Sequence, residues 1–95
     1  MASSIEYLNY VLELLRGTEG ISYKKMMGEF LLYKEGVLFG GVYDNRFLVK
    51  KTPSLESYGL REQIPYPGAK PMLLIDVEDP RAVADLVDEV YLDVK

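Results

Sequence analysis

Histidine and cysteine, the side chains that most often carry acid-base and nucleophilic chemistry, are both absent from the 95-residue sequence. Their absence removes the thiol nucleophile, the disulfide, the thiolate metal ligand and the commonest general base. The carboxylates near the C-terminus have no histidine beside them and lie away from an apolar stripe. We therefore interpret them as the solvated face of a helix. We predict no catalytic residue and no metal site. The carboxylates concerned are Asp85, Asp88, Glu89 and Asp93.

Two glycine-containing segments could bind the phosphates of a cofactor, but neither has the required pattern. The segment YPGAKP at 66–71 lacks the spacing and the Ser or Thr of a P-loop, and no helix opens directly after it. Gly36, Gly40 and Gly41 lie inside an expected hairpin, whereas a dinucleotide-binding fingerprint lies between a strand and a helix. We therefore expect a turn and a hairpin at these places, and no cofactor.

Lysines and tyrosines recur between residues 23 and 51, where they could bind single-stranded nucleic acid by stacking and phosphate attraction. We favour the interpretation that the lysines lie on a solvated sheet edge and oppose aggregation. The net charge is −4, and residues 71–95 hold seven acidic and two basic side chains. Without a basic stripe, strong direct binding to duplex DNA is not expected. The lysines and tyrosines concerned are Lys24, Lys25, Lys50, Lys51, Tyr23, Tyr33 and Tyr43.

Length and composition are typical of one globular domain, which we assign to residues 1–95. Hydrophobic residues make up 48% and charged residues 27% of the sequence, and a chain of this length buries one modest core. The N-terminus has no signal-peptide pattern, and no apolar run reaches the roughly 18 residues of a membrane helix. We predict a cytoplasmic protein without a membrane segment.

The first element that would position these residues is a helix over 3–16. Ser3 and Glu6 have the spacing of a capping box, and an apolar stripe with helical period follows them. Gly17 predicts a left-handed stop.

Three apolar runs separated by two polar pairs predict an antiparallel meander. The pairs Glu35-Gly36 and Asp44-Asn45 tolerate left-handed φ angles and suit two-residue hairpin turns. The expected strands are 27–34, 37–43 and 46–51.

After the meander we expect a short helical turn at 53–58, with Thr52 as its cap and Pro53 at its first position. A fourth strand is expected at 72–77, followed by a helix that begins at Asp79-Pro80. The predicted fold is α+β: an antiparallel sheet, made of a three-stranded meander plus a fourth strand, packed with N- and C-terminal α-helices.

If both turns have two residues, Leu32 pairs with Phe39, Gly40 pairs with Val49, and both faces of the sheet are apolar. Either both faces are then covered, or a bulge at Gly40-Gly41 shifts the register. In the first case the helices cover one face and the other exposes an interaction patch that favours a homodimer. The residues of this predicted interaction patch are Leu31, Val42, Phe47 and Val49.

The segment KMMGEFLLYKEGVLFGG at 25–41 resembles the motif of the TfoX (Sxy) N-terminal domain family. That motif has Met-Phe-Gly, a strand ending in an aromatic residue, a polar-Gly turn, and Met-Phe with a small residue. Met27 stands where the motif has Phe, and Glu29 stands where Gly is common. The matching residues are Met26, Gly28, Tyr33, Gly36, Phe39 and, closing the third strand, Lys50.

The resemblance implies a bacterial regulator of natural competence for DNA uptake, which acts with a cyclic-AMP-dependent activator at promoters. Longer members of the family carry a second, C-terminal domain. Together with the lack of catalytic groups, this favours a non-catalytic protein-interaction module whose partner belongs to the transcription machinery. The alternative is a small ligand-binding domain or enzyme that uses Tyr, Lys and carboxylates in a cleft between sheet and helices.

Overall fold

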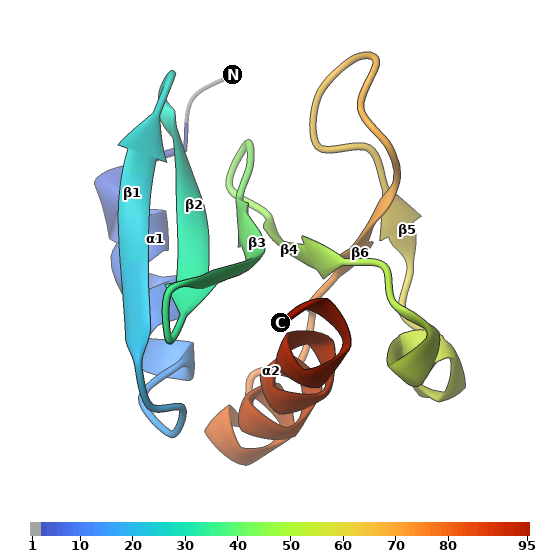
Figure 1. Ribbon diagram of the computed structural model, residues 1–95. Helices are drawn as coiled ribbons and strands as arrows, with labels where there is room; N and C mark the ends of the chain where they lie inside the picture. Colours follow the sequence, from blue (N-terminus) through green and yellow to red (C-terminus); the bar gives the residue numbers. More distant parts are fainter. Residues whose placement is uncertain (1–2) are drawn as a thin grey trace.

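Two α-helices pack on one antiparallel sheet in the computed structural model, which describes residues 3–95 (Figure 1). The predicted α+β class with helices near both termini is confirmed, and the sheet order is β1-β2-β3-β4-β6-β5. No helix within the described residues is long and apolar enough to cross a membrane. The elements are α1 (Ile5–Leu14), β1 (Ile21–Met26), β2 (Glu29–Lys34), β3 (Val37–Val42), β4 (Phe47–Lys50), the 3₁₀-helix η1 (Pro53–Tyr58), β5 (Glu62–Gln63), β6 (Met72–Leu74) and α2 (Pro80–Val94).

The meander has one strand more than predicted. Both predicted turns are present, with positive φ angles at Glu35-Gly36 and at Asp44-Asn45. A third turn at Met27-Gly28, with φ angles of 51° and 84°, lies inside the predicted strand 27–34. It separates β2 from β1, whose sequence ISYKKM has no apolar-polar alternation because most of its side chains are exposed.

A β-bulge at Phe39 changes the register of β2 against β3. Near the turn the pairing follows the prediction, with Tyr33 opposite Leu38, but Leu32 then lies opposite Gly40 and not opposite Phe39. The bulge therefore lies one residue before the predicted Gly40-Gly41 pair. The predicted pairing of Gly40 with Val49 is confirmed.

The bulge changes the face on which the predicted interaction patch lies. Because the register shifts by one, Val42 pairs with Phe30 and lies with it on the face that the helices cover. Val42, Phe47 and Val49 are no more than 1% exposed, so they are core residues and cannot form a surface patch. Leu31 is half-buried. The reason for expecting a dimer through this face is thereby removed.

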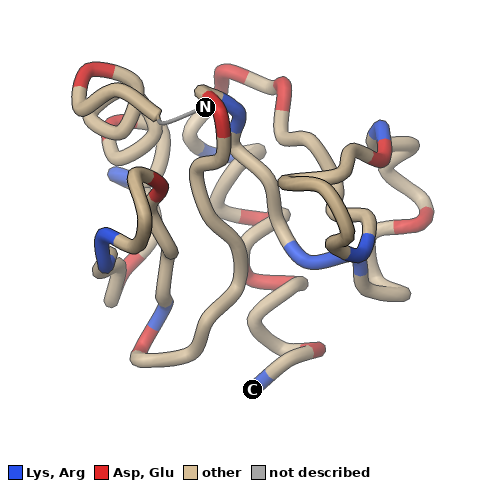
Figure 2. Tube along the Cα trace, turned by 90° about the horizontal axis from the view of Figure 1, so that it is seen from above, with Lys and Arg blue, Asp and Glu red and all other residues tan. Residues whose placement is uncertain are grey.

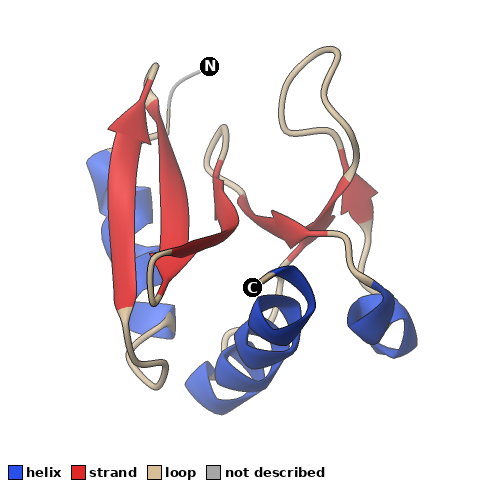
Figure 3. Cartoon of the chain, in the orientation of Figure 1, coloured by secondary structure: helices blue, strands red, loops and turns tan. Residues whose placement is uncertain are grey.

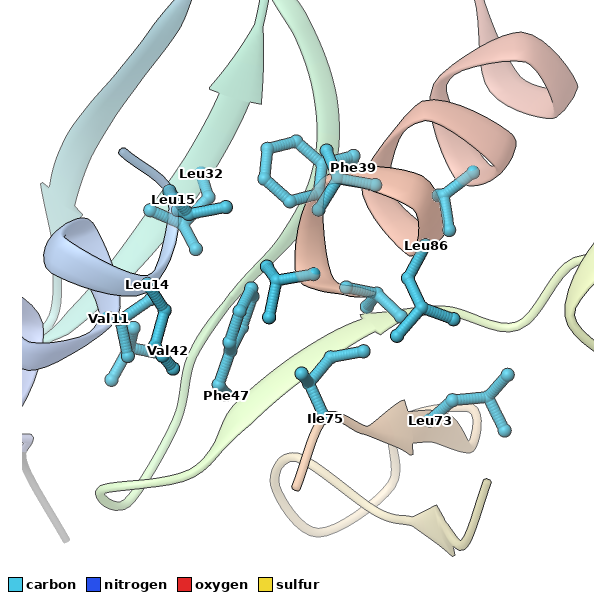
Figure 4. Packing of buried hydrophobic residues seen from close by; sticks show 14 of the residues in the cluster. Val11, Leu14, Leu15, Leu32, Phe39, Val42, Phe47, Leu73, Ile75 and Leu86 are labelled. Atoms are coloured by element: carbon cyan, nitrogen blue, oxygen red, sulfur yellow. The ribbon is translucent and has the colours of Figure 1, made fainter. Parts of the chain in front are cut away.

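The core lies between the sheet and both helices (Figures 3 and 4). Figure 4 shows Val11 and Leu14 of α1 beside Val42, and Phe47 between Val42 and Ile75. Phe39, the bulge residue, is fully buried in the same cluster. The predicted apolar stripe of α2 supplies the other wall, with Val83, Leu86, Val87 and Val90 buried.

The helix ends differ in detail from the prediction. Ser4, not Ser3, caps α1, because its Oγ accepts a hydrogen bond from the Tyr7 N–H at 3.1 Å. Gly17 does not have a positive φ, so the predicted left-handed stop is wrong. The chain leaves the helix through a turn in which the Thr18 N–H donates to the Leu15 carbonyl at 2.9 Å.

The segment after β4 matches the predicted helical turn. η1 begins at Pro53 after Thr52, although the Thr52 side chain makes no capping hydrogen bond. Asp93 of α2 caps the start of η1 instead. Its Oδ1 accepts a hydrogen bond from the Ser54 hydroxyl at 2.9 Å, and its Oδ2 accepts one from the Ser54 N–H at 3.2 Å. These two hydrogen bonds lower the pKa of Asp93 below its usual value.

Candidate functional site

Two separate surfaces combine lysines with exposed apolar or aromatic side chains. One, called here the edge surface, consists of β1 with Ile5 and Met27. The other, called here the tyrosine–lysine hollow, lies over β3, β4 and β6 on the face of the sheet opposite both helices. Charged positions are otherwise spread over the whole chain, without a single basic stripe (Figure 2).

The tyrosine–lysine hollow forms where β3 has a glycine, Gly41, on this face of the sheet. A Cβ at Gly41 would lie 2.7 Å from the ring of Tyr43, so the ring packs directly over the glycine backbone. The result is an open hollow of about 700 Å³. It is lined by Leu38, Gly40, Tyr43, Lys50, Lys51, Pro65, Tyr66, Ala69, Lys70, Pro71 and Met72.

Arg46 holds the wall of the hollow that the loop between β5 and β6 provides. Its Nη1 donates to Gln63 Oε1 at 2.8 Å, and its Nη2 to the carbonyls of Ile64 and Pro65 at 3.2 and 3.3 Å. Its Nε donates to the Tyr43 carbonyl at 3.1 Å. One guanidinium therefore ties the loop to the end of β3, and four hydrogen bonds fix the position of the wall.

The loop itself closes through the predicted turn at 66–71. The Ala69 N–H donates to the Tyr66 carbonyl at 3.1 Å, and Gly68 has a φ of 88° after Pro67. Pro followed by Gly with positive φ is typical of a type II turn. The turn places Tyr66 and Lys70 at the same hollow.

Two tyrosines form an aromatic corner of the hollow. The ring centroids of Tyr43 and Tyr66 are 6.2 Å apart, with the planes tilted by 51°. Tyr43 is 9% exposed and Tyr66 is 58% exposed, so one ring supports the other. Burial raises the pKa of the Tyr43 phenol, and the neighbouring Tyr66 adds to the shift. The Tyr43 hydroxyl thus stays protonated at neutral pH and remains a hydrogen-bond donor.

The charge lining the hollow has one sign. Lys50, Lys51 and Lys70 contribute amines, and none of the described lining residues is acidic. Lys51 pairs with Glu62 just outside, at 3.0 Å. Within residues 3–95, Lys50 and Lys70 form no salt bridge.

The edge surface has an unpaired backbone. β1 pairs with β2 on one side, and no other described strand pairs with its outer side. The Glu35 N–H donates to the Gly20 carbonyl, and hydrogen-bonded pairs alternate along an antiparallel ladder. The backbone groups of Ile21, Tyr23 and Lys25 therefore point away from the sheet.

Exposed apolar side chains surround this edge. Ile5, Tyr23 and Met26 are about half exposed, and Met27 is 96% exposed at the tip of the turn. A second hollow of about 400 Å³ lies here. Its lining residues are Ser3, Ile5, Tyr23, Lys25, Gly28 and Phe30.

A hydrogen-bond network ties the start of α1 to β2 and to the turn between β3 and β4. The Ser3 N–H and Oγ donate to Glu29 Oε1 at 2.9 and 2.6 Å, and the Asp44 N–H donates to Glu29 Oε2 at 3.0 Å. The Ser4 N–H donates to Asn45 Oδ1 at 2.9 Å. Glu29, at a position where the resembling family often has Gly, thus joins the helix start to the turn between β3 and β4.

The residues singled out from the sequence fall into different environments. Of the motif residues, Met26 and Gly28 lie at the edge surface, Phe39 is in the core, Gly36 is in a turn, Tyr33 is half-buried in β2, and Lys50 lines the tyrosine–lysine hollow. The lysine and tyrosine set is divided, with Tyr23, Lys24 and Lys25 on β1 and Tyr43, Lys50 and Lys51 at the tyrosine–lysine hollow.

For two lining residues, Tyr66 and Lys70, the sequence predicts only a turn. The turn is confirmed, but only the pairing of Lys50 with Met72 brings it opposite the end of β4. Within residues 3–95 no group of three or more acidic side chains is placed to hold a metal ion. Neither a protein-family model nor a curated protein matches the chain.

Proposed function

We propose that the chain is a non-catalytic protein-interaction module that binds an extended, acidic segment of a partner protein along β1. The observation that carries this proposal is the free edge of β1, with outward backbone groups at Ile21, Tyr23 and Lys25. An extended segment adds to such an edge as a further strand and gains affinity from main-chain hydrogen bonds.

The side chains around the edge define the preferred segment. Lys24 points to the face opposite Tyr23 and Lys25 and favours carboxylates on the incoming strand, because β1 has no acidic residue of its own. Lys25 adds positive charge beside the hollow. The 400 Å³ hollow beside Tyr23 receives one apolar side chain of the segment, between Ile5 and Phe30. The recognised feature is an alternation of acidic and apolar residues.

A second copy of the chain fits this edge less well than an acidic segment. Two β1 strands paired with each other would bring four lysines together without a carboxylate on either strand, and like charges across a strand pair are destabilising. The same lysines therefore oppose self-association and select a partner of opposite charge.

The resemblance to the TfoX N-terminal domain family supplies a biological setting for this interaction. Met26 and Gly28, two of the motif residues, lie where the partner strand would add. In that setting the partner is a transcription activator of a bacterial, cytoplasmic competence system, and the chain acts on DNA through the partner rather than by strong direct binding.

The test uses an end-capped peptide of alternating Glu and Val and follows the backbone amides of the full chain by NMR. We expect shifts at β1, and none with a peptide of alternating Lys and Val. Lys25→Pro removes an outward N–H and a charge, whereas the matched control Lys25→Ala removes the charge alone. Lys25→Pro should weaken binding at least about tenfold and Lys25→Ala about threefold, since an edge strand tolerates Pro where its N–H faces solvent.

Three results would contradict the proposal: no binding at millimolar peptide, equal losses in the two variants, or shifts confined to the tyrosine–lysine hollow. A dimer in sedimentation that Lys25→Pro abolishes would assign the edge to a second copy of the chain and not to a partner. Thermal unfolding of both variants checks that the fold is retained.

A further inference from the structure

The tyrosine–lysine hollow concentrates positive charge on a chain of net charge −4. Lys50 and Lys70 face it without a carboxylate partner among the described residues, and Lys51 shares its charge with Glu62. Amines gathered in a concave place focus the field on a small volume and favour an anion there. Tyr43 lines the same hollow, and its phenol is a neutral group.

The rest of the lining is apolar or aromatic. A bare ion would make no favourable contact with this part of the hollow. Leu38, Met72 and Pro71 provide aliphatic surface, and the largely exposed ring of Tyr66 stands over the buried ring of Tyr43. A flat ring stacks on tyrosine and covers aliphatic carbons at the same time. The volume of about 700 Å³ is within the range of small-molecule sites.

We propose that the tyrosine–lysine hollow binds a small anionic ligand with a flat aromatic body, its anionic group held by Lys50 and Lys70 and its ring stacked on Tyr66. This site is independent of the edge surface and goes beyond the interaction proposed there.

The surroundings limit the ligand to a small molecule. A neighbouring hollow shares Pro65 and Tyr66 and is lined by the carboxylates Glu29 and Asp44. Arg46 also lines it, but its guanidinium is engaged by hydrogen bonds to the loop and to the Tyr43 carbonyl. A polyanion that extends past Tyr66 would meet these carboxylates, whereas an anion confined to the tyrosine–lysine hollow would not, because neither carboxylate lines it. Single-stranded nucleic acid is therefore disfavoured relative to a single aromatic anion.

The experiment titrates adenosine 5′-monophosphate into the full chain and follows the backbone amides by NMR. Inorganic phosphate and adenosine are titrated in parallel as the anion alone and the ring alone. We expect shifts at Gly40, Gly41, Ala69 and Lys70, with a dissociation constant at least about tenfold lower for the nucleotide than for either fragment. An aromatic carboxylate, benzoate, is run beside phenyl phosphate to distinguish the two sources of anionic charge.

The variant Lys50→Gln/Lys70→Gln should weaken binding at least about tenfold, because each amine contributes a charge-assisted hydrogen bond. The control Lys24→Gln/Lys25→Gln removes the same charge from the edge surface and should change the dissociation constant less than about twofold. Tyr66→Leu, which keeps the lysines, should remove the advantage of the nucleotide over inorganic phosphate.

The proposal is overturned if the two double variants lose affinity equally, which would show a general charge effect. It is also overturned if phosphate alone binds as tightly as the nucleotide, or if no probe shifts the amides of the hollow at millimolar concentration. Tighter binding of an oligonucleotide than of the mononucleotide would assign the hollow to single-stranded nucleic acid instead. None of these outcomes depends on the peptide binding at β1.

Discussion

The edge surface and the tyrosine–lysine hollow use the same residue types in opposite ways. At the edge, six consecutive residues supply the backbone groups, the lysines and the tyrosine, and recognition depends on a strand that lacks a neighbour. At the hollow, β3, the end of β4 and the loop before β6 each contribute a few side chains. The edge is thus a local product of the sequence, and the hollow is a product of the tertiary fold.

The difference follows from the bend in β3 that lies between the two surfaces. In Figure 1, β1 and β2 run steeply, whereas β4 and β6 run across the view. The bulge at Phe39 and the small residues Gly40 and Gly41 allow this change of direction. A surface that needs only one strand is insensitive to the bend, and a surface assembled across the bend depends on it.

Phe39→Ala should have the largest effect, because it removes a fully buried ring from the core cluster that the sheet shares with both helices. The ring is fully buried, and deletion of a buried Phe side chain costs about 3–5 kcal/mol of unfolding free energy. Its neighbour Leu38, half-buried at the hollow, is the matched control and should cost about 1 kcal/mol as Leu38→Ala. Urea denaturation measures both, and equal losses would mean that the bulge residue is not the centre of the core.

Gly40→Ala should separate the two surfaces. The new Cβ would clash with the Leu48 carbonyl oxygen and lie 2.9 Å from the Val49 Cα, so the backbone of β4 must move. Overpacking of this kind costs about 1–3 kcal/mol. Below the unfolding transition, the nucleotide should lose affinity while the peptide at β1 keeps its affinity.

The control for Gly40→Ala is Gly36→Ala, at a φ of 78° with no atom within 4 Å of the added Cβ. It should cost about 1 kcal/mol from left-handed strain and leave both binding reactions unchanged. If Gly40→Ala weakened peptide and nucleotide equally, the two surfaces would not be independent.

Two of the three two-residue turns could be predicted from the sequence, because their signals are local. The residues of Glu35-Gly36 and Asp44-Asn45 tolerate the positive φ angles that such turns need. Asp79-Pro80 is a typical pair for the start of a helix. β1 was missed because an exposed edge strand has no buried face to impose alternation on its residues. The bulge was anticipated as one of two explanations, since two apolar faces are incompatible with an unbroken register.

The tyrosine–lysine hollow could not be predicted from spacing. Lys50 and Lys70 are far apart in the chain, and they meet because β4 pairs with β6 and because Arg46 holds the connecting loop. Neither the pairing of β4 with β6 nor the hydrogen bonds of Arg46 can be predicted from a local sequence pattern. The turn predicted at 66–71 is confirmed as local structure. Only these tertiary contacts bring Tyr66 and Lys70 to the same hollow as Lys50.

Glu62→Gln should produce the smallest effect, because it changes the charge beside the hollow without altering a lining residue. Glu62 pairs with Lys51 at 3.0 Å, and both side chains are about half exposed, so loss of the pair should change the unfolding free energy by less than about 0.5 kcal/mol. The released amine should lower the dissociation constant of the nucleotide about twofold at low salt, and the gain should vanish at high salt. Glu13→Gln is the control, because it breaks the Arg16–Glu13 pair of α1, at 2.9 Å, with the same change in net charge. Equal gains in both variants would show that net charge and not the hollow sets the affinity, whereas a gain confined to Glu62→Gln would place the anion beside Lys51.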